Sequence, residues 1–85
     1  MGYRITFKKS VARDLKKIDR HQADAILRKI QEELPDQAET LPVLAGRFSG
    51  LRKFRIGDYR VIFSIVGDSV IILRIGHRRE IYRSK

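Results

Sequence analysis

The 85-residue sequence contains no cysteine, few acidic residues and no long apolar segment, and each absence excludes a class of protein. Without cysteine, neither disulfide bonds nor a thiolate metal site can hold the domain together. Residues 1–7 alternate between polar and apolar types, unlike a secretory signal. No later stretch approaches the ~18 apolar residues of a membrane span. We therefore expect a soluble, cytoplasmic protein that does not engage membranes.

Common catalytic signatures are also absent. The sequence has no P-loop, no GxGxxG segment, no serine-centred motif or carboxylate pair in a plausible nucleophilic arrangement, and no His, Cys or carboxylate spacing typical of a metal site. We therefore expect neither a metal nor an organic cofactor. A chain this short buries only a little over ~60% of its unfolded surface, so we expect one domain over residues 1–85 with one thin core.

Positive charge is abundant and unevenly placed. Residues 1–45 hold nine Lys/Arg against seven Asp/Glu, a balance of +2, whereas residues 46–85 hold ten against three, a balance of +7; together they give the net charge of +9. Such a concentration attracts polyanions and steers their encounter with the protein. Charge alone does not distinguish a nucleic-acid-binding surface from a solvated cationic face.

The N-terminal segment predicts a strand followed by a helix. Residues 3–7 alternate with the period of a half-buried strand. We expect Ser10 to cap the helix that follows and Asp14 to lie on its solvent face. The apolar stripe of this helix is formed by Val11, Leu15 and Ile18.

A second helix is predicted to begin at Asp19 and to run to Pro35. Asp19 followed three residues later by Gln22 resembles a capping box. The short break at residues 19–20 favours a helical hairpin, whose apolar stripes need a sheet to cover. The stripe of the second helix consists of Ala23, Ile26, Leu27, Ile30 and Leu34.

The remaining residues predict a connecting loop and a three-stranded meander. Residues 36–50 read as a loop anchored by Leu41, Val43 and Leu44. The pairs Gly57-Asp58 and Gly67-Asp68 are typical of tight hairpin turns. They separate strands over residues 52–56, 59–66 and 69–75. The predicted fold is α+β, in the order β-α-α-β-β-β, with the helices on one face of a small, mostly antiparallel sheet and the other face open.

Cations from three segments of this meander are expected to converge. Alternation places Lys53 and Arg55 together on the face without helices, and Arg60 interrupts an otherwise apolar strand. A last basic cluster follows at residues 76–82. Several guanidinium and ammonium groups can hold one phosphate through charge-assisted bonds. For single residues structural roles stay open, since Arg55 could pair with Asp58 or Glu80, and Arg74 could decorate an exposed strand.

Three segments resemble the signature of the RelE/ParE toxin superfamily. They are residues 44–46, residues 50–63 with the Gly-Asp-Tyr-Arg hairpin, and residues 75–82, which begin Ile-Gly-His-Arg and end at Tyr82. With the first strand and the helical hairpin, the resemblance covers nearly the whole chain. Members of the superfamily are small cytosolic toxins of type II toxin–antitoxin systems, each neutralised by a cognate antitoxin. RelE-like members cleave mRNA in the ribosomal A site, whereas ParE-like members inhibit DNA gyrase.

The resemblance implies an endoribonuclease site. By motif position, the lysine, two arginines and C-terminal tyrosine of RelE-like nucleases match Lys53, Arg60, Arg78 and Tyr82. Further RNA or phosphate contacts are expected from Arg52, Arg55, His77 and Arg79. One departure concerns a second lysine that RelE-like toxins often carry just before Lys53, where this chain has Leu51 and Arg52.

The implied reaction is attack of an RNA 2′-hydroxyl on the adjacent phosphate, which leaves a 2′,3′-cyclic phosphate and a free 5′-hydroxyl without a metal. Arg60 and Arg78 would stabilise the charge that develops on the phosphate oxygens. Tyr82 or Lys53 would be the base; for Tyr82 this requires neighbouring cations to lower the pKa of its phenol from about 10. The acid is left open, with His77 as one candidate.

Partners follow from the same resemblance: a cognate antitoxin in a hetero-oligomer, and a ribosome carrying mRNA. An acidic, partly disordered antitoxin that folds on contact would suit the basic surface. Two alternatives remain, namely a ParE-like gyrase inhibitor and an inactive homologue whose role is to bind the antitoxin, because fold alone does not choose between targets.

Overall fold

Two tight turns set the arrangement of the C-terminal half. Gly57 and Gly67 adopt left-handed backbone φ angles of 57° and 62°, which glycine reaches without the steric penalty of a Cβ atom. Each turn joins antiparallel neighbours, so β2 (Arg52–Ile56), β3 (Tyr59–Val66) and β4 (Ser69–His77) lie side by side in one sheet. The predicted meander is confirmed, and its last strand runs to His77 rather than to residue 75.

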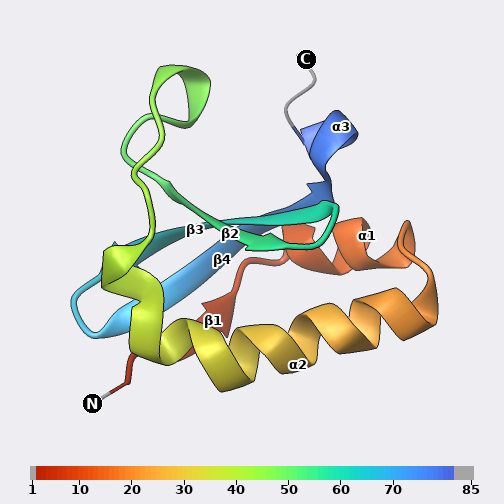
Figure 1. Cartoon of the computed structure of the whole chain (residues 1–85), viewed down its shortest axis with the longest axis horizontal. Helices are drawn as coiled ribbons and strands as arrows, with labels where there is room; N and C mark the ends of the chain where they lie inside the picture. Colours follow the sequence, from red (N-terminus) through yellow and green to blue (C-terminus); the bar gives the residue numbers. More distant parts are fainter. Residues whose placement is uncertain (1, 82–85) are drawn as a thin grey trace.

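The computed structural model describes residues 2–81. Its first strand, β1 (Arg4–Phe7), lies next to β4 and runs parallel to it, so the sheet order is β1-β4-β3-β2 (Figure 1). The helices α1 (Ser10–Lys16) and α2 (Arg20–Gln37) lie between β1 and β2 in the sequence. The short elements are the 3₁₀ helices η1 (Ala38–Thr40) and η2 (Gly46–Phe48) and the single-turn helix α3 (Arg78–Ile81). The predicted α+β class and element order are confirmed.

The ends of the two main helices agree only in part with the prediction. Asp19 caps α2, because its Oδ2 atom accepts hydrogen bonds from the backbone N–H groups of His21 and Gln22 at 3.1 and 3.4 Å. Ser10 is not a cap: it is the first helical residue, and its hydroxyl donates to the carbonyl of Leu73 at 3.3 Å. The α1 N-cap position is instead occupied by Lys9, which makes no side-chain capping bond.

Helix α2 continues through Pro35, where the sequence predicted its end. Proline lacks the N–H that would bond to the carbonyl four residues earlier. Leu34 and Ala38 on either side of it are both buried, so their packing holds the last turn in place. The Pro35 carbonyl accepts a hydrogen bond from the backbone N–H of Tyr3 at 3.3 Å, which ties the start of the chain to this helix end.

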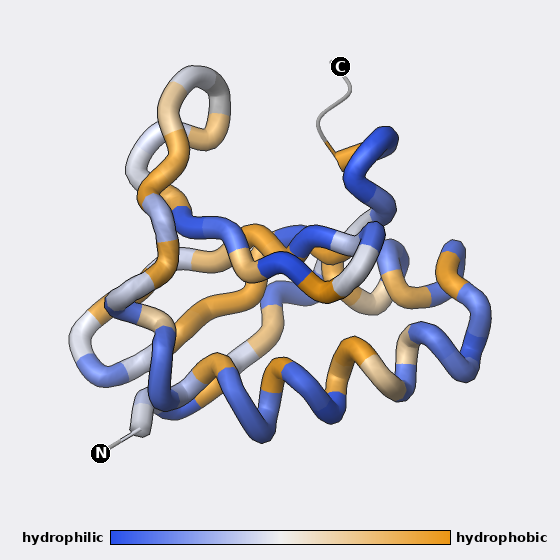
Figure 2. The backbone as a smooth tube through the Cα atoms, in the orientation of Figure 1, coloured by the Kyte–Doolittle hydropathy of each residue, from blue (hydrophilic) through white to orange (hydrophobic). Residues whose placement is uncertain are grey.

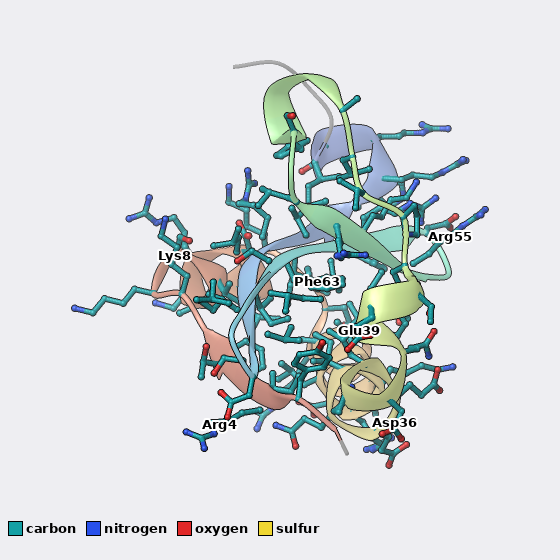
Figure 3. The ribbon with its side chains drawn as sticks, turned by 90° about the vertical axis from the view of Figure 1, so that its left-hand side faces the viewer. Arg4, Lys8, Asp36, Glu39, Arg55 and Phe63 are labelled. Carbon is teal, nitrogen blue, oxygen red and sulfur yellow. The ribbon has the colours of Figure 1, made fainter. Side chains whose placement is uncertain are left out.

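The core fills the layer between the sheet and the two helices. Figure 2 shows apolar stretches recurring along the side of α2 that faces the sheet, and Phe63 of β3 points into this layer in Figure 3. The buried cluster consists of Val11, Ile26, Ile30, Leu34, Ala38, Phe54, Val61, Phe63, Val70, Ile72 and Ile75. Within residues 2–81, no helix has the length and apolar character needed to cross a membrane.

The other face of the sheet is partly covered. Helix α3 and the loop that contains η2 stand on the side of the sheet opposite α1 and α2 (Figure 1). Ile62 shares this face with Lys53, its cross-strand partner, and is 0% exposed; Ile81 of α3 is buried as well. The expectation of an open face is therefore wrong in part, because two short segments that the sequence read as loop and strand end rise over it. In the loop, Val43 is exposed rather than an anchor.

Candidate functional site

A cavity of about 390 Å³ opens on this second face, between the ends of β2 and β3 and the helix α3. All four described residues that line it are cations: Lys53, Arg60, Arg78 and Arg79. Three of the predicted site residues and one predicted phosphate-binding residue therefore come together from separate segments. Tyr82, the fourth predicted catalytic residue, lies outside the described residues.

Arg60 is the most deeply placed of these cations. Arg60 as a whole residue is only 7% exposed. Its Nη1 atom donates to the carbonyl oxygens of Gly57 and Tyr59 at 2.9 and 3.0 Å. These carbonyls satisfy donors but carry no full negative charge, and no carboxylate within residues 2–81 forms an ion pair with Arg60. A buried charge without a counter-ion is costly unless an anion approaches it.

Strand pairing adds a second cation next to Arg60. Arg55 on β2 lies directly opposite Arg60 on β3, and Lys53 lies opposite Ile62. Side chains at directly opposed positions point to the same face, and like charges there repel. Arg55 is exposed, points outward in Figure 3 and forms no ion pair with a described residue. The alternative in which Arg55 pairs with Asp58 or Glu80 is not observed.

The turn between β2 and β3 also holds α3 in place. The backbone N–H of Arg78 donates to the carbonyl of Asp58 at 2.8 Å, and the Arg78 Nε atom lies 3.7 Å from the Asp58 carboxylate. This ion pair is exposed and therefore weak. The same turn thus positions Arg60 and Arg78, and Asp58 is a contact of Arg78 that the sequence reasoning missed.

His77 lies where β4 passes into α3. Its Nδ1 atom accepts a hydrogen bond from the backbone N–H of Arg79 at 3.2 Å. Its ring packs edge to face with Tyr59 at a centroid distance of 5.6 Å. His77 does not line the cationic cavity, so its predicted role at a phosphate there lacks geometric support.

Arg52 belongs to the scaffold rather than to the cavity. Its Nη1 atom donates to the carbonyl oxygens of Glu39 and Leu41 at 3.1 and 2.9 Å. These bonds tie β2 to the loop that follows α2. Because the guanidinium is engaged in this way, the structure does not bring Arg52 to the predicted phosphate site.

Asp14 also departs from the prediction that it faces water. The residue is 9% exposed. Its Oδ2 atom accepts hydrogen bonds from Arg74 Nε at 3.0 Å and from the backbone N–H of Ile75 at 2.9 Å. Strand β1 pairs with β4 only as far as Ile72, so beyond that point α1 and its Asp14 carboxylate cover the strand edge. Arg74 is accordingly not mere decoration.

The arrangement gathers donors suited to one anionic group. Guanidinium groups form charge-assisted, often bidentate bonds to phosphate oxygens. Donors held in place before the ligand arrives stabilise charge that develops during a reaction, without a reorganisation cost. The Arg60 guanidinium is held in this way by carbonyl oxygens of Gly57 and Tyr59, and the same turn anchors the backbone of Arg78. The cavity is thus suited to a phosphate of a nucleic acid.

Comparison with known proteins gives consistent results. The family model described as the ParE toxin of type II toxin–antitoxin systems, parDE, matches residues 5–82. Toxin RelE3 of Methanocaldococcus jannaschii is 29% identical over 84 residues, which cover 93% of this chain and 94% of that protein. In the RelBE2 toxin–antitoxin complex of Mycobacterium tuberculosis, a chain with 26% identity superposes with a TM-score of 0.83, covering 92% of this chain and 100% of that one. In the RelE–RelB complex of Pyrococcus horikoshii, a chain with 27% identity superposes with a TM-score of 0.65, covering 94% of this chain and 99% of that one.

Proposed function

Since the chain belongs to the ParE toxin family of type II toxin–antitoxin systems, we propose that it acts as a RelE-like toxin that cleaves mRNA on the ribosome. The observation that carries this proposal is Arg60, a nearly buried cation without a carboxylate partner among residues 2–81, in a cavity lined by cations. Such an arrangement stabilises charge that develops on a phosphate.

The proposed reaction is an in-line displacement at phosphorus. The RNA 2′-oxygen attacks the adjacent phosphorus, the bond from phosphorus to the 5′-oxygen breaks, and a 2′,3′-cyclic phosphate and a 5′-hydroxyl result. Arg60 faces the nonbridging oxygens from the floor of the cavity, and Arg78 approaches them from α3. Both guanidinium groups keep their charge throughout, so they stabilise the transition state but do not transfer protons.

Two protons must move during this step. A base takes the proton of the 2′-hydroxyl, and an acid delivers one to the leaving 5′-oxygen. Lys53 is the candidate base that lines the cavity, and Tyr82 is the second candidate. His77 does not line the cavity, which favours a supporting role for it over that of the acid.

We further propose that a cognate antitoxin binds this toxin. The Mycobacterium tuberculosis structure is described as a toxin–antitoxin complex, RelBE2, and the Pyrococcus horikoshii structure as a RelE–RelB complex. An acidic antitoxin segment would suit a surface where residues 46–85 carry a balance of +7. It would also supply the counter-charge that Arg60 lacks among the described residues.

The test is cleavage of a translated message by the purified chain and its Arg78→Ala variant. Primer extension on ribosome-bound mRNA should show cuts within codons that vanish when ribosomes are omitted. Loss of one preorganised donor typically lowers such rates by roughly 100-fold or more, so we expect a loss of this size for Arg78→Ala. Arg28→Ala is the matched control, because Arg28 is an exposed cation on α2, across the sheet from the cavity.

Other outcomes point elsewhere. Intact mRNA together with inhibited DNA supercoiling by gyrase would refute the nuclease proposal and favour a ParE-like target. Intact mRNA, unaffected gyrase and stable complex formation with an antitoxin would favour an inactive homologue. Equal cleavage by Arg78→Ala and the unaltered chain would refute the cavity as the cleavage site. The nuclease site would then lie elsewhere on the surface.

A further inference from the structure

A second cavity, of about 260 Å³, lies on the other side of α3 from the cationic one. It is bounded by α1, by the end of β4 and by α3 itself. Its volume is below the ~300–1,000 Å³ of pockets that hold drug-sized ligands, so it suits a group smaller than a drug-sized ligand. The described residues that line it are Asp14, Lys17, Ile18, Tyr59, Arg74, Ile75, Gly76, His77, Glu80 and Ile81.

Among the described residues, the charge of this second cavity is balanced, in contrast to the first. Those that line it include two cations, Lys17 and Arg74, and two carboxylates, Asp14 and Glu80; Arg74 and Asp14 are already paired with each other at 3.0 Å. The cationic cavity has four lining cations and no lining carboxylate among the described residues. A free phosphate would therefore prefer the first cavity, and a neutral polar group would prefer the second.

The second cavity combines ring surfaces with hydrogen-bonding groups. Tyr59 and His77 form an edge-to-face pair on its wall, and Ile18 and Ile81 add apolar surface. The Nδ1 atom of His77 accepts a bond from Arg79, so in the neutral ring the hydrogen is on Nε2, which can donate to a ligand. The Glu80 carboxylate supplies an acceptor.

From these features we propose that the second cavity binds a nucleobase of single-stranded RNA, next to the phosphate held in the cationic cavity. Proteins that read single-stranded RNA stack unpaired bases on aromatic side chains and bond to their edges. The consecutive residues His77, Arg78, Arg79 and Glu80 divide between the two cavities. A nucleotide that wraps around the single turn of α3 would thus place its phosphate on one side and a base on the other.

This inference rests on the proposed function, and its test separates the two. Nucleosides without phosphate and inorganic phosphate without a base are titrated separately into the ¹⁵N-labelled full chain, with ribose as a further probe. Two-dimensional NMR should show that nucleosides shift the amide signals of Ile18, Gly76 and His77. Phosphate should shift those of Lys53, Arg78 and Arg79. Ribose should shift neither set.

The contribution of Glu80 is tested by Glu80→Ala, with Glu32→Ala as the matched control on the exposed face of α2. A hydrogen bond to a charged acceptor contributes enough that its loss weakens binding roughly tenfold. We expect this loss for nucleosides whose bases carry an exocyclic amine, and no change for the control. Because α3 is exposed at Glu80, the variant should fold normally.

The base site would be overturned by nucleosides that shift no signal around the second cavity, or by equal nucleoside affinity in Glu80→Ala and the unaltered chain. Ribose that reproduces the nucleoside response would also overturn it, because the base would then be irrelevant. A missing phosphate response beside an intact nucleoside response would support the base site and count against the proposed phosphate site.

Discussion

Replacement of Asp14 by alanine should destabilise the fold more than the replacement of a solvent-facing helix residue, which the sequence predicted Asp14 to be. The bond from the Ile75 N–H to the carboxylate is buried and charge-assisted, and such bonds contribute about 1.5–3 kcal/mol. The pair with Arg74 adds less, about 0.2–1 kcal/mol, because the Arg74 side chain is 45% exposed. The two contributions share one oxygen and are not additive, so we expect a loss of about 2–3 kcal/mol.

The measurement is urea unfolding followed by far-UV circular dichroism, which needs no tryptophan. Asp14→Asn retains an acceptor for Ile75 but not the charge, so it should cost less than Asp14→Ala. Arg74→Ala should cost at most about 1 kcal/mol. Asp24→Ala, at an exposed position on α2, is the control. An Asp14→Ala variant within about 0.5 kcal/mol of the unaltered chain, the range of ordinary surface changes, would refute the reasoning.

Three further predictions concern the turn, the sheet and the start of the chain. Arg55→Glu should raise the free energy of unfolding by up to about 1 kcal/mol by pairing with Arg60, yet weaken binding to RNA oligonucleotides in fluorescence anisotropy. Gly57→Ala should lower stability by about 1–2 kcal/mol in urea, because alanine at a φ of 57° is strained, whereas Gly57→Asn should lose less. The hydrogen bond to Glu39 raises the pKa of Tyr3. The stability that this bond contributes is therefore present below pH ~10 and is lost as pH rises through the folded-state pKa of Tyr3. As pH rises above ~10, the urea midpoint should accordingly fall less in Tyr3→Phe than in the unaltered chain.

The features that the sequence predicted correctly are governed by neighbouring residues. The Gly-Asp pairs determine their own turns, and alternation of apolar residues then fixes which side chains of β3 enter the core. The Asp19 cap depends on residues two and three positions away. Each of these can be read from a window of a few residues, because the interacting groups lie within it.

The features that the sequence missed depend on distant partners. Asp14 is separated by 60 and 61 positions from the groups that bind it, so no local pattern distinguishes it from the solvent-facing Arg13 and Lys16. Arg52 likewise bonds to carbonyl oxygens 11 and 13 positions earlier. In both cases charged side chains serve the scaffold, and composition alone counts them with the functional cations.

The cationic cavity could be predicted from the sequence only in part. Alternation and the hairpin register predict that Lys53, Arg55 and Arg60 share a face. The degree of burial of Arg60 could not be predicted, because α3, whose Arg78 and Arg79 share the cavity with Arg60, rises over that face. In the sequence, α3 appears only as a basic segment that follows a strand.

The free protein is less stable because Arg60 is buried opposite Arg55. An anion that binds there offsets this loss of stability, which favours its binding. Like charges directly opposed across strands are destabilising by about 0.2–1 kcal/mol, and the buried guanidinium adds a desolvation penalty that carbonyl partners offset only in part. A ligand present at 100 times its dissociation constant stabilises the folded state by about 2.7 kcal/mol, which exceeds the cross-strand repulsion. A phosphate or an acidic antitoxin segment in the cavity would therefore relieve a strain that the fold maintains on its own, and competition between the two for one cavity would couple neutralisation to loss of RNA binding.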